Sequence, residues 1–484
     1  MNKRFVFYML GRILTIESTF ILLPFAVGLI YGESAAWWLL LTAGITLFVG
    51  LGLQFVFRKS DKTLFAREGF AIVALSWIGI SLFGALPFYL SGEISSYTNA
   101  FFETVSGFTT TGASILNEVE SLSQCLLFWR SFTHWIGGMG ILVFIMAITP
   151  TESGRNVHIM RAEMPGPIVG KVAPRIKDTA KMLYLVYIVM TLLQVMLLWA
   201  GDMNLFESLV HSFGTAGTGG FGVKGDSVAG YSAYSQWVIT AFMLLFGINF
   251  NLYCLILLKR IKSAMKSSEL WCYIGIVAVC VTAIAINIVN VMGNTYTTIS
   301  ATIRHSAFQV VSIITTTGFS SVDFNLWPEF SKMILVVLMF IGGCAGSTAG
   351  GLKVSRVMMM FKGVKRDLRH MIHPRSVNSV SFEGKTLERS TLHSVNSYVV
   401  IYVIIFMTIV SILSWESFSF ETSFTATAAC FNNIGPGLGE VGPMGNFDIF
   451  SVTSKWLLSF AMLLGRLEIF PLLLTFSPST WARK

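Results

Sequence analysis

Long apolar stretches alternate with short polar segments along almost the whole chain. Two of them, at about 5–31 and 36–57, come first, and four pairs follow. A membrane-spanning helix needs about 20 mostly apolar residues, and each stretch is long enough to cross a bilayer. We therefore predict two spanning helices followed by four pairs, which lie at 69–91 and 123–148, 180–200 and 233–258, 270–292 and 330–360, and 394–414 and 452–475.

A shorter apolar segment lies between the two members of each pair. These segments, at about 98–108, 204–215, 299–313 and 420–431, are too short to span a bilayer. Each should enter the membrane and return to the same side. Irregular backbone at membrane depth is tolerated only when it is buried in protein or lines a watery cavity. We expect the four turns that follow these segments to meet on one axis.

The four turns share a short sequence that contains glycine: Thr109-Thr110-Thr111-Gly112, Thr218-Gly219-Gly220-Phe221, Thr315-Thr316-Thr317-Gly318-Phe319 and Asn432-Asn433-Ile434-Gly435-Pro436. Backbone carbonyls and threonine hydroxyls can replace the hydration shell of a cation. Glycine permits the backbone angles that would aim carbonyls at an axis. The pattern predicts a cation-selective filter made of Thr110, Thr111, Gly112, Thr218, Gly219, Gly220, Thr316, Thr317, Gly318, Asn433, Ile434 and Gly435.

Composition and charge fit a membrane protein. Hydrophobic residues make up 54% of the chain and charged residues 12%, which leaves little material for a soluble domain. The net charge of +9 comes mostly from clusters between alternate spans, at 58–67, 155–181, 259–266 and 353–389. The positive-inside rule then places both termini in the cytoplasm, and nucleic acid is not needed to explain the charge. The opposite connections are rich in Asp and Glu, so we expect an acidic outer vestibule that concentrates cations.

The chain resembles the TrkH-type membrane subunit of the Trk/Ktr/HKT superfamily of potassium transporters. The resemblance covers nearly the whole chain. It rests on the four helix, pore loop, helix units, on Ser212-Phe213 before Gly219-Gly220-Phe221, and on the third and fourth turns with Gly437. It implies potassium uptake across a bacterial inner membrane, a pore within one protomer, a homodimer, and a cytosolic TrkA-like nucleotide-binding regulatory subunit. It implies neither enzymatic activity nor a bound cofactor; potassium is what is carried.

The expected fold is an all-α polytopic membrane protein with four pseudo-symmetric helix, pore loop, helix repeats around one central pore, plus two extra N-terminal helices. The expected divisions are two N-terminal helices at 1–62, repeat 1 at 63–178, repeat 2 at 179–268, repeat 3 at 269–392 and repeat 4 at 393–484. Repeats 1 and 3 include cytoplasmic linkers.

Departures from better-known filters bear on ion choice. No turn has the tyrosine-containing filter of tetrameric potassium channels, and the first has Ala113 where the next two have phenylalanine. Fewer ordered carbonyls predict modest selectivity. Within the superfamily, serine at the first filter glycine is associated with sodium permeation, and this chain keeps Gly112. The resemblance therefore favours potassium over sodium.

A run of small residues at 342–351 interrupts the second helix of repeat 3. So many glycines do not easily stay helical. We interpret Gly346, Ser347, Thr348, Ala349 and Gly350 as part of an intramembrane loop below the filter, which resembles this family's gating loop. The alternative is a close helix-packing seam of small residues.

Arg466 lies past the middle of the last apolar stretch. An arginine at that depth usually faces a cavity or a partner, and the resemblance assigns it to the ion path as part of the gate. The alternatives are a structural ion pair or a side chain that reaches toward the cytoplasm. Other ionisable residues in apolar segments, Arg130 and His134 among them, are interpreted as packing or interfacial residues.

The cytoplasmic stretch 362–389 is strongly basic, and it could hold the partner subunit or contact anionic membrane lipid. Two function classes remain. One is a gated pore; the other is a sodium- or proton-coupled secondary transporter that works by alternating access. The four repeats share one orientation, whereas rocking carriers usually pair inverted repeats, so the sequence favours the pore. An embedded enzyme is a distant third, because no nucleophile, base and orienting group gather at one membrane face.

Overall fold

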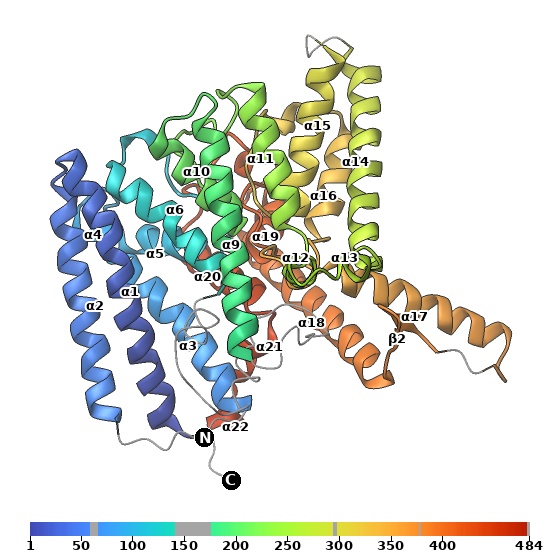
Figure 1. Ribbon diagram of the computed structural model, residues 1–484, viewed down its shortest axis with the longest axis horizontal. Helices are drawn as coiled ribbons and strands as arrows, with labels where there is room; N and C mark the ends of the chain where they lie inside the picture. The colour runs from blue at the N-terminus through green and yellow to red at the C-terminus, as the bar shows by residue number, and fades with distance from the viewer. Residues whose placement is uncertain (59–65, 141–175, 294–297, 377–378, 482–484) are drawn as a thin grey trace.

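The protein is a bundle of long helices (Figure 1). The computed structural model describes residues 1–58, 66–140, 176–293, 298–376 and 379–481. Six helices in these ranges are long and apolar enough to cross a membrane, and two bent helix pairs raise the number to as many as eight. The six are α1 (Lys3–Tyr31), α2 (Ala35–Phe57), α3 (Ala66–Gly84) continued by α4 (Leu86–Leu90), α9 (Ile176–Trp199), α14 (Ser268–Met292) and α18 (Arg389–Leu413). Some of them, such as α9 and α14, run in similar directions, while α3 and α18 are inclined to them (Figure 1).

Four shorter helices lie close to their predicted positions in the sequence: α5 (Tyr97–Phe108), α10 (Leu205–Gly217), α15 (Ile299–Ile314) and α19 (Phe420–Phe431). Polar side chains start three of them: Asn204, Thr298 and Ser419 each accept a hydrogen bond from a backbone N–H of the first turn. Their inner ends are almost entirely buried, which is the arrangement expected of re-entrant segments.

The second helix of each predicted pair is shorter than the sequence suggested. These helices are α6 (Gln124–Gly138), α11 (Ala233–Phe246), α16 (Glu329–Met339) and α20 (Val452–Arg466). After α11 the chain turns by 88° into α12 (Phe250–Leu257), and after α20 it turns by 120° into α21 (Phe470–Phe476). The prediction that 233–258 and 452–475 are unbroken was therefore wrong. The residues after 140 in the predicted helix 123–148 lie outside the described part of the chain.

Local chemistry accounts for the two bends. Asn249 accepts a hydrogen bond from the backbone of Asn251 and so starts α12 in a new direction. After α20, Glu468 and Ile469 take left-handed backbone angles of φ +52° and +65°, which ends a helix. A β-branched residue rarely adopts such an angle, and Ile469 is fully buried, so tertiary packing holds it there.

The remaining elements are short or peripheral. At the end of the bundle that holds both termini lie α13 (Ile261–Ala264), α22 (Pro478–Trp481) and α17 (Val354–Ile372), which points away from the bundle (Figure 1). A small antiparallel hairpin of β1 (Ser381–Phe382) and β2 (Lys385–Thr386) follows α17. In the described residues there are also four single-turn 3-10 helices: η1 (Val119–Ser121), η3 (Phe324–Leu326), η4 (Ser414–Glu416) and η5 (Gly439–Val441).

Candidate functional site

The four glycine turns meet in a closed ring. A Cβ added to Gly112 would overlap the carbonyl oxygen of Gly219 in the second turn. A Cβ added to Gly220 would likewise overlap the carbonyl oxygen of Thr317, and one added to Gly318 would overlap that of Ile434. A Cβ added to Gly435 would lie 2.9 Å from the carbonyl oxygen of Thr111. Each turn therefore packs its glycine against a carbonyl of the next repeat, and the fourth turn returns to the first.

The backbone of the ring repeats almost identically in the four turns. Each turn has a non-glycine residue at positive φ, and two residues later a glycine that is also at positive φ. The φ angles are 56° for Thr110, 56° for Thr218, 55° for Thr316 and 55° for Asn433, then 81° for Gly112, 79° for Gly220, 84° for Gly318 and 103° for Gly435. Side chains with a Cβ rarely adopt positive φ. Four matched exceptions at one place indicate a built site.

Each turn forms one quarter of the ring, and the four quarters differ in their side chains. In the first turn the hydroxyls of Thr109 and Thr111 lie 2.8 Å apart, and Thr315 and Thr317 repeat this distance in the third. The second and fourth turns have glycine, asparagine and isoleucine at these positions. Asn433 instead donates from Nδ2 to the hydroxyl of Thr111, 2.9 Å away. The ring thus combines a backbone that repeats four times with a threonine pair that repeats only in the first and third turns.

The ends of α5, α10, α15 and α19 all lead directly into the ring. The C-terminus of a helix has a partial negative charge because its last carbonyls lack helical partners. Four such ends close to one ring of carbonyl oxygens make the site favourable for a cation and unfavourable for an anion. The ring therefore has the donors and the electrostatics of a cation site.

A cavity of about 120 Å³ adjoins the ring on its outer side. Its lining includes Gly112, Gly220, Arg130 and Lys224, and none of its described lining residues is Asp or Glu. The expectation of an acidic vestibule is wrong for this inner part of the mouth. Several outer carboxylates serve helix starts instead.

Asp202 shows this structural use most clearly. It accepts hydrogen bonds from the backbone N–H of Ser232, at 2.7 Å, and from the hydroxyls of Ser232 and Ser235 at the start of α11. Partial burial raises the pKa of Asp202, but these hydrogen bonds outweigh it and hold the pKa below its usual value. Glu416 caps α20 in the same way through Ser451 and Ser454.

Residues 340–353 form a non-helical loop between α16 and α17, directly below the ring. The backbone N–H of Gly350 donates to the hydroxyl of Thr316 in the third turn, 2.6 Å away. Cys344 donates to the carbonyl of Gly247, at 2.9 Å, where α11 and α12 bend. The predicted loop residues from Gly346 to Gly350 lie in this loop, and the loop touches the ring.

Two charged residues that sequence reasoning missed also hold the loop. Glu269, buried at the start of α14, accepts hydrogen bonds from the backbone of Ala345, at 2.7 Å, and of Ser355, at 3.1 Å. Lys353 is buried and donates to the carbonyls of Ala349 and Gly350. Both lie next to polar or basic segments in the sequence, where positive-inside bias and helix capping already explain a charge, so no pattern singled them out.

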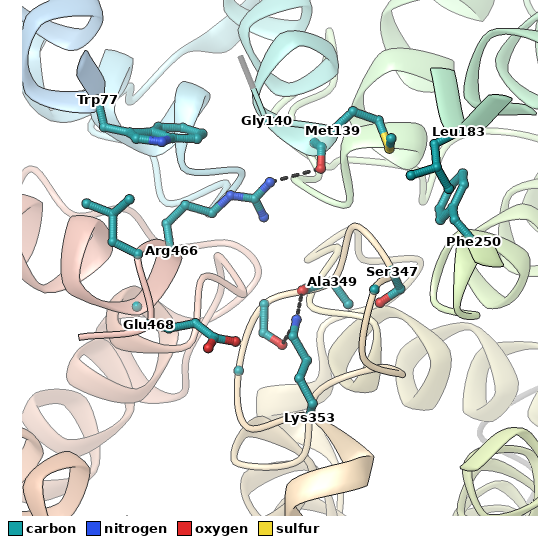
Figure 2. Close-up of a pocket in the computed structure, with 16 residues that line it drawn as sticks. Trp77, Met139, Gly140, Leu183, Phe250, Ser347, Ala349, Lys353, Arg466 and Glu468 are labelled. Atoms are coloured by element: carbon teal, nitrogen blue, oxygen red, sulfur yellow. Dashed lines mark hydrogen bonds between the residues drawn. The ribbon is translucent and has the colours of Figure 1, made fainter. Parts of the chain in front are cut away.

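Arg466 reaches into a small cavity of about 50 Å³ below the ring, lined by the loop and by the ends of α6 and α20 (Figure 2). It donates to the carbonyls of Gly137 and Gly138, to the carbonyl of Thr348, at 3.1 Å, and to the hydroxyl of Thr110, at 3.4 Å. Arg466 therefore joins the first turn, α6 and the loop. Glu468 pairs at 2.5 Å with Arg356, not with Arg466.

Comparisons with known proteins agree with this architecture. The family model described as TrkH, cation transport protein, matches residues 40–483. The chain is 37% identical to the Trk system potassium uptake protein TrkH of Escherichia coli K12, over 99% of this chain and 100% of the relative. The chain belongs to the TrkH family. It is also 32% identical to the Escherichia coli protein TrkG, over 99% of each chain.

The crystal structure of the potassium transporter TrkH from Vibrio parahaemolyticus has the same fold, with a TM-score of 0.89 and 33% identity over 100% of both chains. This TrkH family member is thus a polytopic membrane transport protein and not an enzyme. Among the described residues, no group of three His, Cys, Asp or Glu side chains is placed to hold a metal ion.

Proposed function

We propose that this protein takes up potassium ions through the ring of four turns, which acts as its selectivity filter. The closed ring, with its matched positive φ angles, carries the proposal. The named relatives are potassium uptake proteins, and we carry that substrate over to this chain. The ion-binding groups are the backbone carbonyls and threonine hydroxyls of the twelve predicted ring residues.

Selection among cations depends on how closely the carbonyls surround a dehydrated ion and on how many there are. The ring glycine of each turn (Gly112, Gly220, Gly318 and Gly435) lets the next turn approach within contact of its backbone. A larger residue would push two carbonyls apart on one side of the ring. Potassium is favoured over sodium because Gly112 keeps the first quarter as closely packed as the other three.

The loop at 340–353 is the proposed gate, and Arg466 is the residue that holds it closed. The loop lies against the ring through Gly350 and Thr316, and Arg466 fixes the carbonyl of Thr348 while placing a positive charge beside the path. A fixed cation there raises the barrier for potassium. Opening requires the loop and the guanidinium to move away together, and residues without bulky side chains make that movement feasible.

The packing-seam alternative for 342–351 requires a continuous helix. The break between Met339 and Val354 supports the loop instead. Arg466 donates hydrogen bonds to the carbonyls of Gly137, Gly138 and Thr348 and to the hydroxyl of Thr110, so it connects the loop to the ring. Both observations support the gate.

Assembly and control follow the family. We propose a homodimer in a bacterial inner membrane, with both termini in the cytoplasm, and a cytosolic TrkA-like nucleotide-binding subunit. A cleft of about 560 Å³ between α17 and α18, lined by Arg366, Arg375 and Arg389, offers a basic surface for an acidic segment of that subunit or for anionic lipid. The division into two N-terminal helices and four repeats, at the boundaries given above, belongs to the same proposal.

Purified protein in proteoliposomes tests the proposal directly. We expect rubidium and potassium uptake driven by a potassium gradient alone, and rescue of a potassium-uptake-deficient bacterium at low external potassium. A flux that requires a sodium or proton gradient would favour the secondary transporter. No rescue, with or without a TrkA-like subunit, would reject potassium uptake.

A further inference from the structure

A buried ion pair lies behind the first quarter of the ring. Arg130 of α6 and Glu103 of α5 approach to 2.6 Å, between Nε and Oε1, and their side chains are 4% and 0% exposed. Two charges are rarely removed so completely from solvent unless their remaining hydrogen bonds are satisfied. The other hydrogen bonds and ring contacts of Glu103 and Arg130 therefore indicate the role of this ion pair.

Both partners hold segments that leave the ring. Glu103 accepts hydrogen bonds from the hydroxyl of Ser114 and from the backbone N–H of Ile115, each at 3.0 Å, just after the first turn. Arg130 donates to the carbonyl of Gly222, at 3.2 Å, and its guanidinium lies 3.5 Å from the ring centre of Phe221, just after the second turn. The pair is thus a joint between the first and second quarters.

In the described chain, none of the other three joints has an ion pair as buried as this one, although Lys455 and Asp448 of the fourth repeat both bond to Asn99 of the first. The contacts closest to the ring at these joints are made by uncharged groups. Ser320 bonds to Ser227 and Val228 between the second and third quarters. Asn325 exchanges two hydrogen bonds with Gly439 between the third and fourth, and Phe447 donates to the carbonyl of Ser114 between the fourth and first.

The charge at the first joint also breaks the repeat. At the place that Glu103 occupies before its ring glycine, the other repeats have His211, Gln309 and Ala426. The repeat fold therefore does not require a carboxylate there, and the ion pair is specific to the joint beside Gly112.

We propose that Glu103 and Arg130 are positioning residues that set ion selectivity by fixing the distance between the first and second turns. This inference rests on the proposed filter. The carbonyl of Gly219 packs against Gly112 at this joint, so any slack there enlarges the ring on one side. Carbonyl rings discriminate by spacing and by the field of their dipoles. Because the two charges cancel, the joint is held without a net charge that would repel cations from the outer cavity that Arg130 lines.

Arg130→Lys tests this idea, because lysine keeps the charge but loses the planar fork and the stacking on Phe221. We expect the potassium to sodium flux ratio in proteoliposomes to fall roughly tenfold, with unchanged thermal stability in detergent, which corresponds to about 1.4 kcal/mol of lost discrimination. Glu103→Gln should lower the ratio and also the potassium flux, since it leaves the arginine charge uncompensated. Glu103→Gln combined with Arg130→Met should recover flux but not the ratio.

The control breaks a second ion pair, Lys455 with Asp448, whose atoms approach to 2.5 Å. Asp448→Asn should leave the flux ratio unchanged, and a ratio that falls as far as in Arg130→Lys would overturn the assignment. A wild-type ratio in Arg130→Lys would also overturn it. If Arg130→Lys does not fold, Phe221→Leu removes the stacking on Arg130 together with the ring contact to His134, and leaves the ion pair in place. A ratio equal to wild type in Phe221→Leu then rejects the joint.

The two levels of the proposal fail in different ways. Wild-type protein that carries no potassium would reject the filter itself. Wild-type protein that discriminates potassium from sodium, together with variants that do so equally well, would reject only the role of Glu103 and Arg130.

Discussion

The ring and the layer directly beneath it are built on opposite principles. In the ring, four segments of one chain adopt the same backbone angles and close on one another. Below it, α6 ends at Gly138, α11 turns by 88°, α16 opens into the loop at 340–353, and α20 stops at Arg466. A spherical ion is best surrounded by equivalent ligands, whereas a gate needs one part that moves against the rest. Under the proposed function, symmetry is kept at the filter and lost at the gate.

The largest effect should come from adding a side chain to the ring. Gly112→Ser forces atoms against the carbonyl of Gly219. Overpacking costs roughly 1–3 kcal/mol, so potassium flux should fall about tenfold or more, and the potassium to sodium ratio should fall with it. Proteoliposome fluxes of rubidium and sodium measure both.

The matched control for this change is Gly92→Ser. Gly92 has φ +80°, against +81° for Gly112, and nothing lies within 4 Å of its added Cβ. The same backbone strain is then imposed outside the ring, and transport should not change. An unchanged ratio in Gly112→Ser, or equal losses in both variants, would remove the first turn from the filter.

The layer below should respond in the opposite direction. Deletion of residues 346–348 removes the loop's tip but keeps the anchors at Cys344 and Gly350. We expect potassium flux without any partner to rise, with the potassium to sodium ratio preserved because the ring is intact. Flux that stays at the wild-type level in a folded protein would mean that the loop is only a packing element.

Arg466→Ala should give a smaller rise in flux. It removes the charge beside the path and the bonds to Thr348 and Gly138, but leaves the loop's own anchors in place. Arg466→Lys keeps the charge and should lie between wild type and alanine. Loss of thermal stability with no rise in flux would assign Arg466 to structure alone.

The smallest effect should lie outside both regions. Asp202→Asn weakens the start of α11 and should lower stability by about 1 kcal/mol without changing transport. Because the folded-state pKa of Asp202 is depressed, its stabilisation is present above the unfolded pKa near 3.9 and is lost as the pH falls through the folded value. Melting temperatures of wild type should therefore fall more steeply than those of Asp202→Asn as the pH is lowered toward 3. Parallel melting curves would contradict this.

Much of the fold could be predicted from the sequence because the bilayer imposes lengths. Spanning helices and half-length helices differ plainly in the number of consecutive apolar residues, and α5, α10, α15 and α19 were placed within a few residues. The bends after α11 and α20 could not be predicted, because Ile248, Leu467 and Ile469 continue the apolar run. Hydropathy indicates that a residue is buried, but it does not indicate the direction that the chain takes after that residue.

The candidate site divides in the same way. Glycine and threonine motifs locate the turns, and the structure brings them together as expected; their roles stay a prediction. The pair of Glu103 and Arg130 had no such signal, since contacts between helices leave no periodic pattern in one sequence. The many acidic residues in the outer connections also led to a wrong prediction, that of an acidic outer cavity. The number of carboxylates does not show which of them cap a helix and which face an ion.

All four quarters of the ring belong to a single polypeptide, and this has a genetic consequence. In a channel of four identical subunits, one codon change alters all four subunits. Every mutation near the ion therefore changes the whole filter at once. Here one codon alters one quarter and leaves three as they were. One mutation can therefore change the ring in a small step, and the four turns can differ in sequence, as the turn containing Asn432 and Asn433 does.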